Sequence, residues 1–158
     1  MSETQEFSLT LTQEQDFTFR IRFDDTQIPD LHTDEPPPLG GDAGPNPSRL
    51  LVTAVANCLA ASLLFSLRKF RNSPATIIAR ARATLERNEQ KRLRVSHIAV
   101  SIDLPEAAES YQHLERLLGQ FEDFCVVTES VRSGVAVDVT VRDAQGAVVH
   151  DTAAKALN

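Results

Sequence analysis

The longest apolar run in the chain places the strongest limit on how it can fold. Residues 50–67 read LLVTAVANCLAASLLFSL and contain no charged side chain. Apolar residues occupy nearly the whole circumference of such a helix, so it has to be buried on most of its sides. A chain of 158 residues forms one core and has difficulty surrounding so long a helix alone. The run therefore predicts a long buried central helix whose remaining face is covered by a second copy, that is, a homodimer.

The same run is too interrupted for a membrane span. A bilayer-spanning helix needs about 20 apolar residues, and this run carries Thr53, Asn57, Ser62 and Ser66. The acidic N-terminus lacks the basic and apolar regions of a signal peptide. A net charge of −6 also disfavours nucleic-acid binding, which needs clustered cations. We expect a single cytoplasmic domain with neither a membrane nor a nucleic-acid partner.

The signals at the two ends of this helix are clear. Asn46 is a candidate N-cap, and Pro47 suits the first helical position. We expect the helix to end near Phe70, beside the cations that a C-terminus favours. The preceding segment, 32–47, holds five prolines and three glycines, which exclude a helix or a central strand. We expect a long loop there, with Asp34 and its acidic neighbour more plausibly solvated than bound to a metal or substrate.

Alternating apolar and polar residues predict strand pairs on both sides of the loop and helix. Residues 6–24 predict a hairpin with its turn at 12–16. Residues 76–87 and 93–104 predict a second hairpin. On the last of these strands, the alternation places Ile98, Val100 and Ile102 on one face and Val95 on the other.

The C-terminal third predicts one more helix and one more strand pair. Apolar residues recur at helical spacing, with Cys125 on the same stripe: Tyr111, Leu114, Leu117, Leu118, Phe121. Alternating valines at positions 135–141, a turn at 144–146 and a short strand at 148–150 follow. The order of elements predicts an α+β fold with a mostly antiparallel sheet.

The chain has two cysteines, Cys58 in the apolar helix and Cys125 at the end of the later stripe. Neither they nor the four histidines show ligand spacing, so no metal site and no cofactor are expected. A permanent disulfide is not expected in a reducing cytoplasm. Two interpretations of the cysteines remain open, a pair of buried structural thiols and a reactive thiol with its partner. Spacing alone favours the structural one.

A set of motifs in the loop and both helices resembles the OsmC/Ohr family of osmotically induced and organic hydroperoxide resistance proteins. These motifs are Pro38-Leu39-Gly40-Gly41, Gly44-Pro45-Asn46-Pro47, Leu50-Leu51, Ala54, Asn57-Cys58 and Phe124-Cys125-Val126-Val127. The resemblance identifies a divergent OsmC-like member, with one OsmC-like domain over residues 1–158. It implies an intertwined homodimer with sites at the subunit interface. It also implies a cysteine-based, peroxiredoxin-like peroxidase of the oxidative-stress response.

In that family scheme Cys58 is the peroxidatic cysteine, which reduces an organic hydroperoxide, and Cys125 is the resolving cysteine. A dithiol reductant then reopens the disulfide.

The chain departs from the family pattern beside the first cysteine. The resemblance expects a glutamate directly after Asn-Pro, orienting an arginine against the thiolate, and this chain has Ser48 there. The candidate activating arginines are Arg20, Arg22 and Arg49. A second function stays open for this reason. It is a non-catalytic OsmC-like dimer that binds a small apolar or thiol-bearing ligand at the subunit interface.

Overall fold

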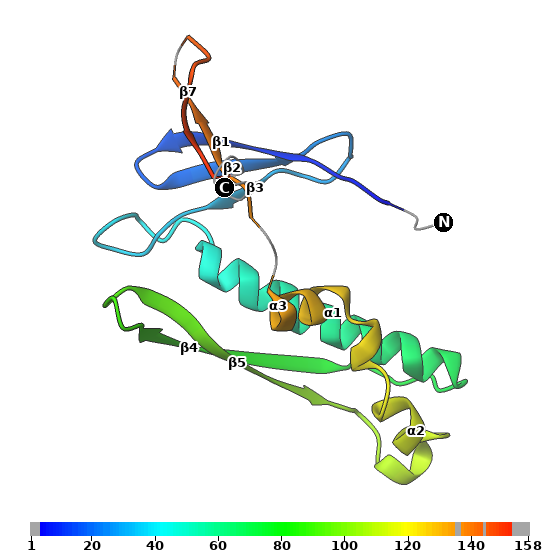
Figure 1. The fold of residues 1–158 in the computed structure, drawn as a ribbon. Coiled ribbons are helices and arrows are strands. Elements are labelled where there is room, and N and C mark those ends of the chain that lie inside the picture. The colour runs from blue at the N-terminus through cyan, green and yellow to red at the C-terminus, as the bar shows by residue number, and fades with distance from the viewer. Residues whose placement is uncertain (1–3, 135–136, 144, 153–158) are drawn as a thin grey trace.

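The computed structural model describes residues 4–134, 137–143 and 145–152. Its central element is helix α1 (Pro47–Lys69), with the hairpin of β4 (Ile78–Arg87) and β5 (Leu93–Asp103) packed along it. The short helices α2 (Leu114–Leu118) and α3 (Val126–Ser133) also contact α1, as Figure 1 shows. The arrangement is α+β with antiparallel strand pairs, as predicted.

Helix α1 begins and ends where its sequence signals predict. The Asn46 side chain caps it by accepting a hydrogen bond from the Arg49 backbone amide at 3.0 Å. Pro47 is the first helical residue, where a missing amide hydrogen costs nothing. The helix ends at Lys69, with Phe70 as its C-cap.

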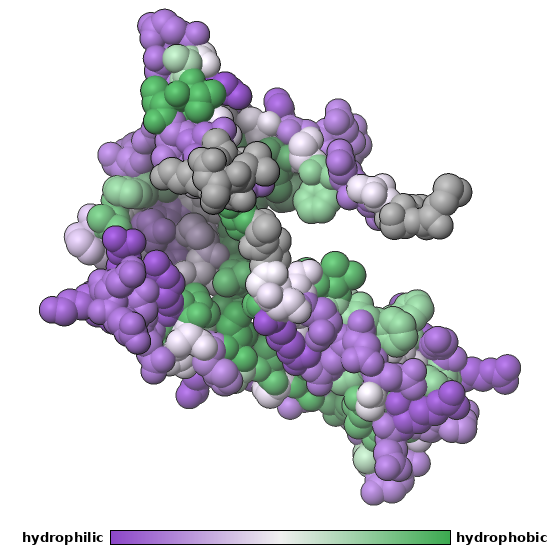
Figure 2. All heavy atoms as spheres, viewed as in Figure 1, coloured by the Kyte–Doolittle hydropathy of each residue, from purple (hydrophilic) through white to green (hydrophobic). Residues whose placement is uncertain are grey.

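Burial of α1 within one chain is restricted to a single face. Its buried residues follow helical spacing: Val55, Leu59, Leu63, Ser66, Leu67. Leu51 and Phe65 are exposed, Phe65 by 63%, so the prediction of burial on most sides is wrong for the isolated chain. Figure 2 shows apolar surface in the hollow of the molecule. Among the described helices α1 is the one long and apolar enough to cross a membrane, a test that the core helix of a soluble protein also passes.

The β4–β5 hairpin covers the buried face of α1 and contains one irregularity. The two strands pair antiparallel from Ile78↔Asp103 to Arg87↔Leu93. The register shifts where Thr84 pairs with His97 and Leu85 with Val95. The extra residue of the bulge reverses the alternation beyond it. Val95 therefore shares the half-buried face with Ile98, and its predicted placement on the opposite face is wrong.

The N-terminal sheet has three strands instead of the predicted two. These are β1 (Leu9–Gln15), β2 (Thr18–Phe23) and β3 (Leu31–Thr33), in the order β1-β2-β3. Strand β1 continues through polar residues as far as Gln15, so the turn at Asp16 is shorter than predicted. Strand β3 occupies the start of the proline-rich segment, ahead of its first proline, where backbone amides remain available.

The predicted second helix is not continuous. It divides into the 3₁₀ turn η1 (Ala108–Ser110), α2, the 3₁₀ turn η2 (Glu122–Phe124) and α3. The breaks include one at His113, which is left-handed with φ 56°, and one at Cys125, which is extended and forms the N-cap of α3. Leu117 and Cys125 of the predicted apolar stripe are fully buried, whereas Leu118 is exposed, so its predicted place on the buried stripe is wrong.

The last strands among the described residues are β6 (Thr140–Arg142) and β7 (Val148–Asp151). The prediction of a strand starting at residue 135 falls partly outside the described residues, as does position 144 of the predicted turn. Val137 and Val139 precede β6, so the strand is shorter than predicted.

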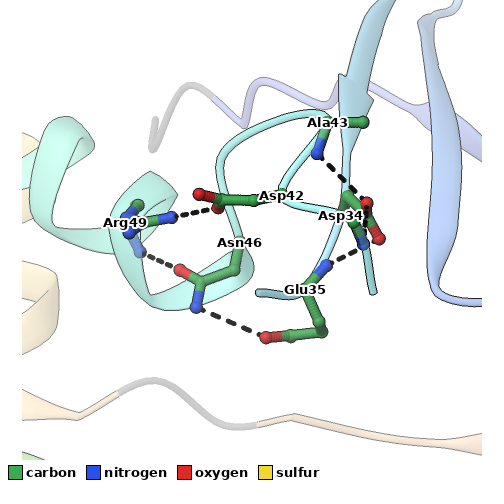
Figure 3. Close-up of polar contacts among 7 residues, drawn as sticks. Asp34, Glu35, Asp42, Ala43, Asn46 and Arg49 are labelled. Atoms are coloured by element: carbon green, nitrogen blue, oxygen red, sulfur yellow. Dashed lines mark hydrogen bonds and ion pairs between the residues drawn. The ribbon is translucent and has the colours of Figure 1, made fainter. Parts of the chain in front are cut away.

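Asp34 organises the proline-rich loop before α1. It is 3% exposed and accepts hydrogen bonds from the backbone amides of Glu35 (2.8 Å), Gly41 (2.8 Å) and Ala43 (3.1 Å). The amides of Ala43 and Gly41 hold the pKa of the Asp34 carboxyl below its ordinary value, against the opposing effect of burial. Figure 3 shows these contacts of Asp34, together with the hydrogen bond from the Asn46 side chain to the Glu35 carboxylate. The expectation of a solvated carboxylate is wrong here, because three loop amides need an acceptor.

The same loop has no room for a side chain at Gly40. A Cβ there would overlap the Asp34 carboxylate and the Glu35 carbonyl oxygen, whereas a Cβ at Gly41 would lie 3.6 Å from Asp34 Oδ2. We expect Gly40→Ala to lower the free energy of unfolding by about 1–3 kcal/mol, as overpacking does. The matched Gly41→Ala should stay within about 0.5 kcal/mol of the parent. Urea unfolding measures both, and equal losses would contradict this account of the loop.

Candidate functional site

The two cysteines meet where the middle of α1 faces the start of α3. Both are free thiols, Cys58 half-buried and Cys125 fully buried. Their side chains pack in one cluster, and each thiol influences the pKa of the other. The fold therefore joins two residues 67 positions apart in the sequence.

An apolar shell surrounds this thiol pair. Val55 and Leu59 flank Cys58 on the buried face of α1, and the inward side chains of β5 complete the shell together with two residues from the α3 side: Ile98, Val100, Ile102, Phe121, Val127. Such a shell excludes water and makes each polar contact to sulfur count for more.

The polar partners of the sulfurs come from the first turn of α3 and from α1. Cys125 Sγ lies 2.9 Å from the Thr128 hydroxyl oxygen, and Thr128 is itself buried. The backbone amides of Val127 and Thr128 act to lower the pKa of the Cys58 thiol, and that of Thr128 also lowers the pKa of the Cys125 thiol. Ser62, one turn beyond Cys58 on α1, contacts Cys125. Amides of a first helical turn have no partner within the helix, so they are available to a thiolate.

These contacts shift the pKa values of the two thiols in opposite directions. Burial raises the pKa of the Cys58 thiol, and its hydrogen bond with Cys125 raises it further. Burial also opposes ionisation of Cys125, but the hydrogen bonds from Cys58, Thr128 and Ser62 lower the pKa of the Cys125 thiol overall. The Cys125 thiol is therefore the more readily ionised of the two.

The three candidate activating arginines pair with acids within the described residues. Arg20 lies 3.3 Å from Glu14 and Arg22 lies 2.9 Å from Asp24, both within the N-terminal sheet region. Arg49, in the first turn of α1, lies 2.9 Å from Asp42. Within one chain these side chains are therefore not brought together with Cys58.

Ser48, at the position of the family glutamate, is also apart from the sulfurs. It lines a groove of about 850 Å³ between α1 and β4, together with Asn57 and the alanine face of β4. The described residues hold no cluster of three or more side chains suited to a metal ion.

A cleft of about 620 Å³ opens beside the thiol pair. Its walls are apolar side chains of α1 and β5, and Thr128 lines it next to Cys125. Its polar residues include His97, Glu122 and Arg132, with Arg132 bridging Glu122 and Glu129. A small molecule with an apolar body fits this chemistry. The cysteines do not line the cleft themselves, and Val55, Leu59 and Thr128 lie between it and the sulfurs.

Fold and site together define an α+β protein with a paired-thiol centre between a long central helix and the first turn of a short one. The chain belongs to the OsmC-like protein family, whose model matches residues 40–140. Comparison with curated proteins found no match.

Solved structures of this family share the fold at low sequence identity. An OsmC-like protein from Vibrio cholerae is 17% identical with a TM-score of 0.66, over 80% of this chain and 94% of that one. An organic hydroperoxide resistance protein OsmC from Legionella pneumophila is 15% identical with a TM-score of 0.62, over 85% and 96%. The organic hydroperoxide resistance protein OhrB of Bacillus subtilis is 17% identical with a TM-score of 0.58, over 83% and 95%. These similarities confirm the predicted fold, and the family model confirms the predicted family.

Sequence reasoning missed Thr128 and Ser62. The available signal for Thr128 is its place three residues after Cys125, the spacing at which a capping side chain meets the first helical turn. The sequence pattern does not reveal this capping position, because it places Cys125 on the apolar stripe of the preceding helix, whereas Cys125 begins a new one. Ser62 lies four residues after Cys58, so it shares a helix face with it.

The contacts around the sulfurs predict two separate thiol ionisations. A free cysteine ionises near pH 8.5. With its hydrogen-bond donors, Cys125 should ionise below its ordinary value and Cys58 above it, because a second charge beside the first is disfavoured. Thiolate absorbance at 240 nm during a pH titration of the reduced protein should rise in two steps. A single step covering both thiols would contradict the assignment.

Proposed function

We propose that the chain is a thiol-dependent peroxidase that reduces organic hydroperoxides through Cys58 and Cys125. The observation that carries the proposal is the contact between a half-buried and a fully buried thiol beside an apolar cleft. Support also comes from structural relatives described as organic hydroperoxide resistance proteins. The apolar cleft suits an alkyl hydroperoxide better than a small, strongly hydrated one.

The exposure of the two sulfurs favours Cys58 as the peroxidatic residue. A peroxide has to reach the sulfur in line with its O–O bond, and Cys125 is 0% exposed. Cys58 thiolate would attack one peroxide oxygen, release the alcohol and become a sulfenic acid. Cys125 thiolate would then attack that sulfur and release water, forming a disulfide that a dithiol reductant reopens.

A second candidate function is ligand binding without turnover. The observations that favour it are the raised pKa of the Cys58 thiol and the Ser48 residue in place of a glutamate. In that case the cleft holds a small apolar or thiol-bearing molecule while both cysteines stay reduced.

We also propose that the working unit is an intertwined homodimer. The single chain exposes 12386 Å², whereas a folded monomer of 17.4 kDa exposes about 7,900 Å². The β1–β3 sheet and the β6–β7 pair stand apart from the α1 layer in Figure 1, and their main contacts are internal. Exposed apolar residues such as Phe65 remain on α1. A second copy that packs into the hollow seen in Figure 2 would bury exposed apolar residues of α1 and cover the open side of the site.

The peroxidase proposal predicts one disulfide within each chain. Reduced protein given one equivalent of tert-butyl hydroperoxide should form a Cys58–Cys125 disulfide, mapped by mass spectrometry without reductant. Cys58→Ser should abolish peroxide loss above the buffer rate, because the accessible sulfur is gone. Cys125→Ser should instead accumulate a Cys58 sulfenic acid that dimedone traps. If both thiols stay reduced while peroxide persists, the ligand-binding function replaces this one.

The dimer proposal predicts the mass of the protein in solution. Sedimentation equilibrium at micromolar concentration should give twice the chain mass of 17.4 kDa. Replacing Phe65 with Asp places a charge on the exposed apolar face of α1 and should shift the mass toward that of one chain. A stable, well-folded monomer of the parent protein would contradict the proposal.

A further inference from the structure

The hydroxyl oxygen of Thr128 lies 2.9 Å from Cys125 Sγ, in direct hydrogen-bond contact. Both groups are buried, with Thr128 5% exposed. Cys125 is the N-cap of the eight-residue helix α3, and Thr128 lies in its first turn. A hydroxyl rotates freely between accepting from a thiol and donating to a thiolate. This contact can therefore follow a change of protonation without any movement of the backbone.

We propose that Thr128 is a positioning residue for Cys125, whose hydroxyl stabilises the Cys125 thiolate when that thiolate attacks as the resolving nucleophile. This inference rests on the proposed peroxidase function and concerns its second step, the formation of the disulfide. The Cys125 thiol donates to the Thr128 hydroxyl at rest, and the hydroxyl can turn to donate once Cys125 has lost its proton.

The protons balance along this route. Cys58 loses its proton to solvent and attacks the hydroperoxide as a thiolate. The S–O bond forms as the O–O bond breaks, and the alkoxide leaves as the alcohol with the proton of the Cys125 thiol. Cys125 is then a thiolate that accepts from the Thr128 hydroxyl, and it attacks the Cys58 sulfenic acid. The S–S bond forms as the S–O bond breaks, and hydroxide leaves as water with a proton from solvent.

Among the described residues, the charged groups near the pair lie on the cleft walls and outside the cluster that contains the sulfurs. Helix α1 is uncharged from residue 50 to residue 67. The packed elements contribute His97 from β5, Glu122 from η2 and Arg132 from α3 to the cleft walls. Arg132 is occupied by ion pairs with Glu122 and Glu129. The hydroxyl of Thr128 is the polar side-chain group that lies both on the cleft and on Cys125.

The test compares Thr128→Val, which keeps the shape and removes the hydroxyl, with Thr128→Ser, which keeps the hydroxyl. Ser130→Ala is the matched control, because the Ser130 hydroxyl donates to the Val126 carbonyl on the same helix and does not contact sulfur. Circular dichroism verifies folding. The first readout is the 240 nm titration of Cys125 in a Cys58→Ser background. The second is the pH profile of disulfide formation in a single turnover with tert-butyl hydroperoxide.

We expect Thr128→Val to raise the Cys125 pKa and to slow disulfide formation at neutral pH by about tenfold or more, the effect of losing a hydrogen bond to a charged group. The deficit should shrink as the pH rises, because the thiolate then forms without help. Thr128→Ser should restore both readouts to within about twofold, and Ser130→Ala should change neither. An unchanged Cys125 titration and an unchanged pH profile in Thr128→Val would overturn the inference. Absence of any disulfide in the parent protein would instead overturn the peroxidase function, and the Cys125 titration would still decide the role of Thr128.

Discussion

The burial requirement of helix α1 determines most of this structure. The helix is apolar around its circumference, and one chain covers only the stripe that runs from Val55 to Leu67. The β4–β5 hairpin and the short C-terminal helices supply that cover, and the remaining apolar surface stays open to solvent. Because Cys58 lies in the middle of the same helix, the elements that cover α1 also enclose the Cys58 sulfur. Fold, proposed assembly and site therefore follow from one physical constraint.

The junction between α1 and α3 gives the site its particular chemistry. A cysteine in a helix interior receives no hydrogen bond from the amides of its own helix, since those amides already bond to helix carbonyl groups. Here a second helix begins at Cys125, and its first turn brings the Thr128 hydroxyl to the Cys125 sulfur. The hydroxyls of Thr128 and Ser62 lower the pKa of the Cys125 thiol, whereas Arg20, Arg22 and Arg49 are occupied by ion pairs within the chain.

Local signals in the sequence were enough to predict the main elements. Asn46 and Pro47 fixed the start of α1, and simple alternation located the β4–β5 hairpin, because capping and strand periodicity depend on near neighbours. The failures involve features that depend on distant partners. The bulge that turns Val95 inward depends on its pairing with β4, and the break at Cys125 depends on packing against α1. Thr128 was missed for that second reason, although the family resemblance had identified both cysteines.

The claim that α1 needs a second copy is tested most directly by unfolding the reduced protein in urea at several protein concentrations. If folding and association are one process, each tenfold increase in concentration stabilises the folded state by about 1.4 kcal/mol, and the unfolding midpoint rises accordingly. The account predicts this rise over the range from about 1 to 100 µM. A midpoint that does not change with concentration, in a protein that sediments as a single chain, would contradict it.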